Sequence, residues 1–242
     1  GLLAECDDPE HGRWLDPGDI ESLLASYGVD LIRSIDIASP PAAAAAFDEL
    51  GPAIAMKAVG PTILHKSDVG GVALDISTAE DAAAVYERFA AMFGSDLTGA
   101  IAQPMAVPGP EVILGLLQDP TFGPVILFGT GGTTAELWGD TAHALVPVTA
   151  TRASELVNEP RGSALLRGYR GSEPADTAAL EDLVMRLSAL ASDHPTIAEL
   201  DLNPVIVGTN GYTIVDARCR VAQPKRRALE VRRLRKIGRE TR

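Results

Sequence analysis

The sequence predicts an α+β protein built from two lobes. Helix and strand signals interleave, strand-like runs often come in pairs before the next helix, and a break at residues 94–99 divides the chain. Paired strands favour mixed or antiparallel sheets covered by helices over a simple alternating βα repeat. We therefore expect an N-terminal extension over 1–15, one lobe over 16–99, a second over 100–222, and a basic tail or linker over 223–242.

Four helices are expected from capping residues and apolar spacing. A cap followed by proline starts the first two helices, and Gly28 and Gly51 end them. The expected caps are Asp16, Ser39, Ser77 (with Glu80 at capping-box spacing) and Asp176. The apolar residues at helical spacing are Ile20, Leu23, Leu24 and Tyr27 in the first helix, Val85, Phe89 and Met92 in the third, and Leu180, Leu183, Val184, Leu187, Leu190 and Ala191 in the fourth.

Strand-like runs lie between these helices. Each is apolar or alternating and is bounded by turn residues such as glycine and proline. The runs cover residues 31–37, 53–59, 72–76, 100–103, 111–117, 125–128, 197–202 and 212–215.

The composition is that of an ordinary globular protein. The 242 residues are 46% apolar and 22% charged, which supports a real core and argues against disorder. No stretch approaches the eighteen or so apolar residues of a membrane span, and two cysteines without a CxxC pair favour a reducing cytoplasm. The chain opens Gly-Leu-Leu without an initiator Met or a basic leader, so we expect no signal peptide and a segment of a longer protein.

Charge is distributed unevenly along the chain. The whole chain carries −12, but residues 218–242 hold 11 of the 21 basic residues, so the first 217 residues carry −21. A body this acidic repels phosphate backbones, which argues against general nucleic-acid binding. The basic tail is interpreted as a solvated end or linker, with contact to an acidic partner as the alternative.

Cationic and glycine residues between positions 57 and 72 indicate a phosphate site. Lys57 lies in an apolar run, so it either projects toward an anion in a cleft or sits on a solvated edge strand. His65 and Lys66 precede Gly70 and Gly71, whose backbone N–H groups can approach an anion closely. A neutral imidazole can accept a phosphoryl group presented in line, while a satisfied loop or core histidine is the alternative.

A second glycine-rich stretch runs from Phe128 to Glu136 and reads Phe-Gly-Thr-Gly-Gly-Thr-Thr-Ala-Glu. It does not satisfy the GxGxxG pattern of dinucleotide-binding folds. It therefore predicts either a tight hairpin or a loop that closes over a phosphate or an incoming group.

Oxygen ligands are concentrated near the C-terminal end of the predicted body. Strand alternation places Glu199, Asp201 and Asn203 on one face. If the run 212–215 pairs back as a hairpin, Asp216 comes near Asn203. Carboxylate and amide oxygens suit Mg²⁺, which shares its coordination shell with phosphates. The alternative is an acidic outer face of a hairpin.

Several motifs occur in a familiar order. They are Lys57, His65-Lys-Ser-Asp-Val-Gly-Gly-Val72, Gln103-Pro-Met105, Glu111-Val-Ile-Leu-Gly115, Asp119-Pro-Thr-Phe-Gly-Pro124, Phe128-Gly-Thr-Gly-Gly132, Glu199-Leu-Asp-Leu-Asn-Pro204 and Val215-Asp-Ala-Arg218. In this order they resemble the ATP-grasp domain of NDP-forming acyl-CoA synthetases, the family of ADP-forming acetyl-CoA synthetase, which is related to the β subunit of succinyl-CoA synthetase. The resemblance covers roughly residues 16–222.

The resemblance implies an ATP-grasp fold, with the nucleotide between two α+β lobes, and a use of ATP/ADP and Mg²⁺. It also implies a role for each motif. The phosphates would be contacted by Lys57, Lys66, Gly70 and Gly71, the adenine by Gln103 and Met105, and the ribose end by Glu111. Mg²⁺ would be bound by Asn203 and Asp216, with Glu136 and Asp201 as supporting acids. The second phosphohistidine would be His65.

The implied function is the ATP-binding, phosphotransfer half of an acid–CoA ligase that forms ADP. The CoA-binding ligase domains and the first phosphohistidine are not in this chain, so a partner module in the same parent chain or an α subunit is expected. One alternative is a regulatory synthetase-like domain fused to a GNAT-type protein lysine acetyltransferase, without ligase turnover. Another ATP-grasp ligase with an amine acceptor would share the nucleotide site, but it would not explain the segment from His65 to Asp68.

Overall fold

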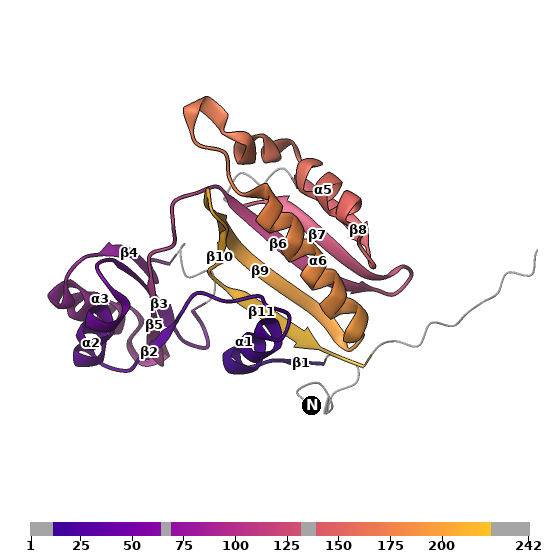
Figure 1. Ribbon diagram of the computed structural model, residues 1–242. Helices are drawn as coiled ribbons and strands as arrows, with labels where there is room; N and C mark the ends of the chain where they lie inside the picture. Colours follow the sequence, from indigo (N-terminus) through magenta and orange to yellow (C-terminus); the bar gives the residue numbers. More distant parts are fainter. Residues whose placement is uncertain (1–11, 64–68, 132–138, 224–242) are drawn as a thin grey trace, which may run out of the picture.

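The computed structural model describes residues 12–63, 69–131 and 139–223, and these form two antiparallel sheets with helices packed on them (Figure 1). The larger sheet has the order β1-β11-β9-β6-β7-β8, with β10 paired to β9, and the smaller has the order β2-β5-β3-β4. Every strand pairing within these sheets is antiparallel. The predicted α+β class and the predicted antiparallel sheets are confirmed.

The two sheets take their elements from different parts of the chain. The smaller lobe contains β2 (Ile35–Ile37), α2 (Pro40–Leu50), β3 (Ile54–Val59), β4 (Val72–Ile76), α3 (Ala79–Phe93), the 3-10 turn η1 (Gly94–Asp96) and β5 (Gly99–Pro104). The larger lobe contains β1 (Arg13–Trp14), α1 (Pro17–Ala25), β6 (Glu111–Asp119), β7 (Gly123–Thr130), β8 (Thr141–Leu145), α5 (Ala150–Asn158), the 3-10 segments η2 (Arg161–Arg167) and η3 (Tyr169–Gly171), α6 (Thr177–Asp193), β9 (Ile197–Val207), β10 (Tyr212–Ile214) and β11 (Ala217–Val221).

The division between the sheets differs from the division at residue 99 that the sequence predicts. Strand β5 lies inside the smaller sheet, where Met56 of β3 pairs with Ala102. At the other end, β1 pairs with β11 and helix α1 contributes to the core of the larger sheet. The break at 94–99 only connects α3 to β5, because strand pairing depends on partners far away in the chain.

Two helix caps follow the prediction. The Ser39 hydroxyl accepts the Ala42 N–H at 3.4 Å, and the Asp176 carboxylate accepts the Ala179 N–H at 3.0 Å. All six apolar residues predicted for the fourth helix are buried on one side of α6. Their 3.6-residue spacing was sufficient to identify the face that packs on the sheet.

Three helix details differ from the prediction. Asp16 precedes α1, but its side chain makes no capping bond. The third helix is capped by Thr78 rather than Ser77, because the Thr78 hydroxyl lies at the correct spacing to accept the Asp81 N–H, at 3.0 Å. Met92 is exposed, because it lies opposite the Gly70 turn rather than over the sheet.

Strand boundaries also differ from the prediction. The run 31–37 keeps only three strand residues, and β9 continues through Pro204 to Val207. Pro204 is tolerated there because its carbonyl accepts the Val215 N–H at 3.0 Å, a contact that needs no amide hydrogen on proline. Among the described residues, the elements that the sequence did not indicate are β1, β8, β11, α5 and the three 3-10 segments η1, η2 and η3.

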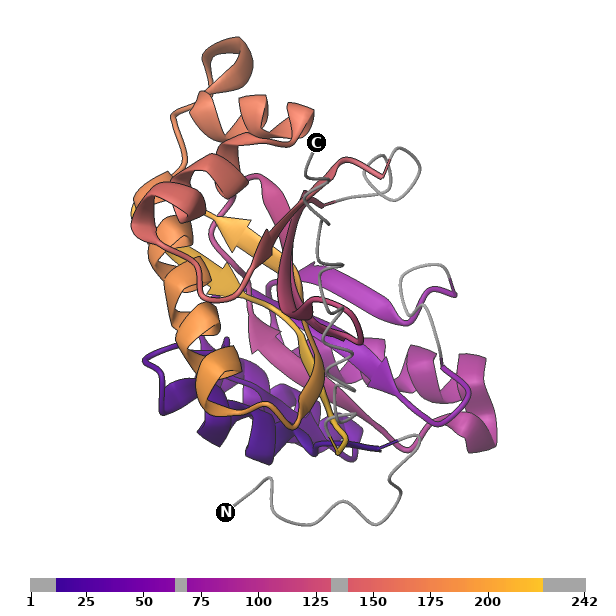
Figure 2. The ribbon, with the colours of Figure 1, turned by 90° about the vertical axis from the view of Figure 1, so that its right-hand side faces the viewer.

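Each lobe has its own core. In the larger lobe, Leu114, Phe128 and Leu183 are fully buried between the sheet and α5 and α6. Figure 2 shows these two helices on one side of the larger sheet. In the smaller lobe, Met56 and Phe89 are fully buried against α2 and α3.

Within the described residues, no helix has both the length and the apolar character needed to cross a lipid bilayer.

Candidate functional site

Residues of the smaller sheet meet the larger sheet at the backbone carbonyl of Val215, between β10 and β11. Lys57 Nζ, from β3, lies 3.4 Å from this carbonyl oxygen, and Gln103 Nε2, from β5, donates to it at 3.2 Å. Lys57 is half-buried, and it projects toward the other lobe rather than lying on a solvated edge. The structure therefore excludes the edge-strand interpretation of Lys57.

Gln103 connects three segments from a buried position. Its side-chain amide donates to the Ser34 hydroxyl at 2.9 Å as well as to Val215, and the residue is only 6% exposed. Its Oε1 is buried and has no hydrogen-bond partner among the described residues. A buried acceptor without a partner is costly, so a ligand N–H would be stabilised at this position.

Asn203 and Asp216 are brought together as the sequence predicts. The Asn203 N–H donates to the Asp216 carbonyl at 3.1 Å, and Asp216 follows directly after Val215. The Asp216 carboxylate accepts the N–H of Ala217 at 3.0 Å. Asn203 lies on β9, and Asp216 lies in the connection between β10 and β11, which both pair with β9 here: Ile214 pairs with Val205 and Ala217 pairs with Leu202.

This pair fits a magnesium ion in the chemistry of its donors. One amide oxygen and one carboxylate are hard ligands, and Mg²⁺ keeps several water or phosphate oxygens when proteins bind it. Among the described residues there is no group of three or more His, Cys, Asp or Glu side chains that could hold a metal.

Asp201 lies one step further along the same face of β9. In the strand registers, it lies opposite Arg218 of β11 and opposite Gly115 of β6. Burial raises the pKa of its carboxyl group, while Arg218 lowers it and the carboxylates of Asp216 and Glu199 raise it further. Leu200 and Leu202, on the opposite face, are fully buried, so the alternation predicted for this strand is confirmed.

The other predicted residues surround this junction. The Gly71 carbonyl accepts the Ala58 N–H at 2.7 Å, which places the glycine pair at the start of β4, beside Lys57 on β3. Gly70 has φ +74°, a conformation that favours glycine. Met105 is half-buried at the end of β5, and Glu111 is exposed at the start of β6. His65, Lys66 and Glu136 lie outside the described residues.

Two structural features, one at this junction and one at η2, have no simple sequence signal. The Val215 carbonyl is a backbone group, so no residue type could have identified it. Asp140 accepts the N–H groups of Arg161 and Gly162 at 2.9 and 2.7 Å, and these bonds lower the pKa of its carboxyl group. An aspartate that follows glycine suggests only a turn, so its bonds to η2 could not be foreseen.

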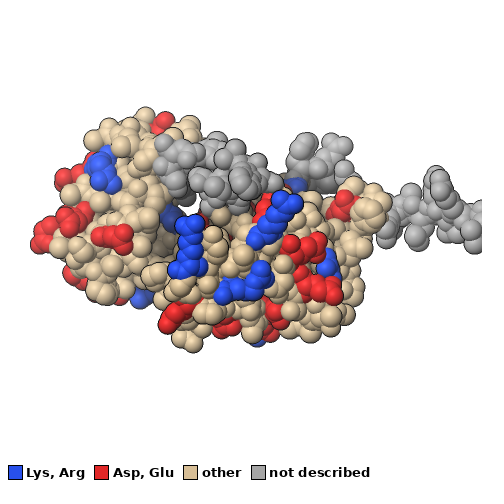
Figure 3. All heavy atoms as spheres, turned by 90° about the horizontal axis from the view of Figure 1, so that it is seen from above, with Lys and Arg blue, Asp and Glu red and all other residues tan. Residues whose placement is uncertain are grey.

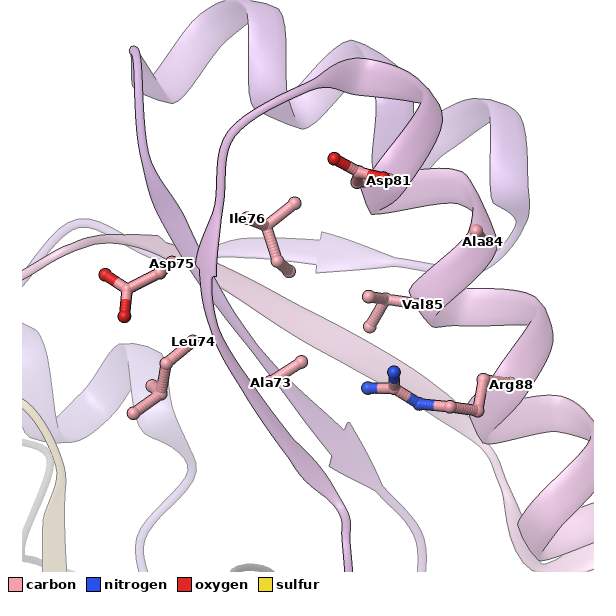
Figure 4. A pocket seen from close by; sticks show the side chains of 8 residues that line it. All are labelled: Ala73, Leu74, Asp75, Ile76, Asp81, Ala84, Val85 and Arg88. Carbon is pink, nitrogen blue, oxygen red and sulfur yellow. The ribbon is translucent and has the colours of Figure 1, made fainter.

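A pocket of about 660 Å³ lies away from this junction, between β4 and α3. In Figure 4, Val85 and Arg88 project from α3 toward the strand, whereas Leu74 and Asp75 lie on the other side of β4. None of the predicted site residues lines it, so we do not assign the candidate site there. Figure 3 shows basic side chains over the middle of the molecule and acidic side chains on both lobes.

Comparison with known proteins agrees with this geometry. A family model described as an ATP-grasp domain matches residues 8–221. The chain is 38% identical over 205 residues to an ADP-forming acetate–CoA ligase I of Archaeoglobus fulgidus, a match that covers 81% of this chain and 29% of the relative. It is 34% identical over 206 residues to the β subunit of an ADP-forming acetate–CoA ligase I of Pyrococcus furiosus, with 83% of this chain and 88% of that subunit covered.

A solved structure has the same fold. It is the dinucleotide-forming acetyl-coenzyme A synthetase 1 of Ca. Korarchaeum cryptofilum in complex with coenzyme A, Ca-AMPCP and HgCl⁺, with a TM-score of 0.79 and 33% identity over 86% of this chain and 93% of that one. The fold and site therefore define an ATP-grasp domain. The chain belongs to the ATP-grasp family, in the β-subunit type of ADP-forming acyl-CoA synthetases. It spans about 29% of the length of the Archaeoglobus relative.

Proposed function

We propose that this chain is the ATP-binding, phosphotransfer half of an ADP-forming acyl-CoA synthetase. The observation that carries the proposal is the convergence of Lys57, Asn203 and Asp216 around Val215, where the two lobes meet. A cation from one lobe and oxygen ligands from the other suit a nucleotide triphosphate that lies between them. Bound nucleotide is described for the Korarchaeum structure.

Each residue has a distinct task in this proposal. Lys57 contacts the phosphates, and Gly70 and Gly71 cover them without side-chain clashes. Asn203 and Asp216 hold Mg²⁺, which neutralises phosphate charge when bound, and Asp201 supports that pair. The unpartnered Gln103 Oε1 accepts a hydrogen bond from the adenine amino group, while Met105 and Glu111 meet the adenine and the ribose.

The chemical step is an in-line phosphoryl transfer. A ring nitrogen of neutral His65 attacks the γ-phosphorus, a P–N bond forms, and the bond to the bridging oxygen breaks to release ADP. The phosphoryl group then passes to a histidine in the CoA-binding module. That module, in the same parent chain or as an α subunit, uses it to activate the acid for transfer to CoA. A cytoplasmic location fits this use of ATP and CoA.

Calorimetric titration with ATP, with and without Mg²⁺, tests nucleotide binding, and ³²P transfer from γ-labelled ATP tests the chemistry. His65→Ala should bind ATP with nearly unchanged affinity but accept no phosphate, and the ligase assembled with the CoA-binding module should not turn over. Normal turnover by this variant would refute the phosphate relay. Absence of ATP binding by the wild-type chain, alone and assembled, would refute the proposed function.

A further inference from the structure

The face of the larger sheet that α5 and α6 do not cover carries a row of four apolar and two charged side chains. Strand registers place its members side by side, one on each of six strands. In order they are Trp14 of β1, Arg220 of β11, Glu199 of β9, Leu117 of β6, Val125 of β7 and Leu145 of β8. We call these six residues the outer row.

The large members of the outer row are unusually exposed. Trp14 is 54% exposed, Leu117 52% and Leu145 55%. The residues that precede Leu117 and Leu145 in the chain, Leu116 and Ala144, point to the opposite face of the sheet and are buried in the core beneath the helices. Large apolar side chains aligned along one exposed sheet face indicate a surface that another protein covers.

The two charged members of the outer row neutralise each other. Arg220 Nη2 lies 3.0 Å from the Glu199 carboxylate, and the Arg220 guanidinium lies 5.9 Å from the centre of the Trp14 ring. Both ionic groups are therefore already partnered within the row. The row presents a neutral surface, which suits an apolar protein surface better than an anionic ligand.

The outer row is continuous with the candidate site. Along β9, Glu199 is followed on the same face by Asp201 and then Asn203. Four residues of strand span about 13 Å, so a protein seated on the outer row comes within reach of the proposed Mg-nucleotide site at Asn203 and Asp216. In the proposed relay, His65 takes the phosphoryl group from ATP at this site, so the histidine of the other module has to approach the same site to receive it.

Both ends of the described chain also leave at this edge of the sheet. Gly12 is packed so closely on Val221 that a Cβ at Gly12 would lie 2.2 Å from the Val221 carbonyl oxygen. Trp14 follows Gly12 by two residues, and Arg220 precedes Val221. The described part of the chain therefore begins and ends beside the outer row.

We propose that the outer row is the docking surface for the CoA-binding module of the same ligase. This inference rests on the proposed function, because the docked module is the one that receives phosphate. The module contributes an apolar patch that covers Trp14, Leu117 and Leu145. A second copy of this chain is the competing occupant.

The test measures assembly of this chain with its CoA-binding module supplied as a separate polypeptide, by sedimentation velocity. We expect Leu117→Asp/Leu145→Asp to bind the module at least tenfold more weakly than the wild-type chain, because buried apolar anchors dominate such interfaces. The matched control is Leu74→Asp, a strand leucine that is 60% exposed on β4 and lies outside the row. It should bind the module within twofold of wild type.

Thermal unfolding and ATP affinity, measured on each variant alone, show whether the substitutions leave the fold and the nucleotide site intact. If Leu117→Asp/Leu145→Asp unfolds early, Trp14→Ser replaces it as the row variant in the same assay. The inference is overturned if folded row variants bind the module like wild type, if the wild-type chain does not bind the module, or if the row is buried in a homodimer instead. Failure of wild-type phosphotransfer with intact docking would count against the proposed function only.

Discussion

The sharpest test of the candidate site is replacement of Lys57 by methionine. Met keeps the unbranched stem but removes the ammonium group that we place against the phosphates. A hydrogen bond to a charged group contributes about 1.5–3 kcal/mol. The dissociation constant for Mg-ATP should therefore rise by roughly tenfold to a hundredfold.

The same substitution should change folding much less. The Nζ atom of Lys57 lies 3.4 Å from the Val215 carbonyl, which is long for a hydrogen bond. Gln103 donates to that carbonyl at 3.2 Å, so its oxygen keeps a partner in the variant. We expect the free energy of unfolding in urea to fall by about 1 kcal/mol. The assay is calorimetric titration with Mg-ATP beside urea unfolding of the same sample.

The matched control is Arg33→Met, which removes an exposed cation whose side chain pairs with Glu49 of α2 rather than with Val215. Arg33 forms an exposed ion pair with Glu49 on the surface, and such pairs contribute little. Its ATP affinity should stay within twofold of wild type. The reasoning is refuted if both variants lose affinity equally, if Lys57→Met binds ATP normally, or if its weaker binding is matched by a loss of several kcal/mol in folding stability.

Three further predictions concern single groups. Asp216→Asn should weaken the Mg²⁺ enhancement of ATP binding by about tenfold, as expected for the loss of one charged ligand contact, while titration without Mg²⁺ should hardly change. Asp140→Asn should lower stability at pH 7 by about 1 kcal/mol, because the two carboxylate oxygens accept the N–H groups of Arg161 and Gly162 separately and an amide has only one oxygen. These bonds lower the pKa of the Asp140 carboxyl group below 3.8, so their contribution to the free energy of unfolding is present above pH 3.8 and is lost as the pH falls through the lowered pKa. Urea unfolding from pH 7 to pH 2 should show that the stability difference between wild type and variant shrinks. Burial raises the pKa of the Cys219 thiol to about 12, so iodoacetamide at pH 8 should label Cys219 only after unfolding. Peptide mass spectrometry separates this label from one on Cys6, and rapid labelling of Cys219 in the native protein would contradict its buried position.

Local patterns in the sequence identified the main elements of both lobes. The caps at Ser39 and Asp176 are bonds between residues three positions apart, so they depend on nearby sequence alone. The alternation on β9 follows from strand geometry, which places Asp201 and Asn203 opposite Leu200. The predicted proximity of Asn203 and Asp216 followed from one local hairpin, and the structure confirms it.

Strand pairings and side-chain contacts between segments that are far apart in the chain could not be predicted from these local patterns. Strand β5 pairs with β3 in the smaller sheet, although the sequence places it beyond the break at 94–99. The side chain of Gln103 reaches Ser34 and Val215, at separations of 69 and 112 residues. No local periodicity encodes such contacts.

By itself the sequence determined the fold class, most of the helices, the order of the motifs and the family to which the chain belongs. Capping, periodicity and motif spacing depend on residues that are close together in the chain, so they can be recognised from the residue types alone. Only the tertiary structure decided that Lys57 and Gln103 meet the Val215 carbonyl, and that Trp14, Leu117 and Leu145 share one exposed row. Those arrangements depend on which strands pair and in which register, and register is set by the packing of the whole sheet.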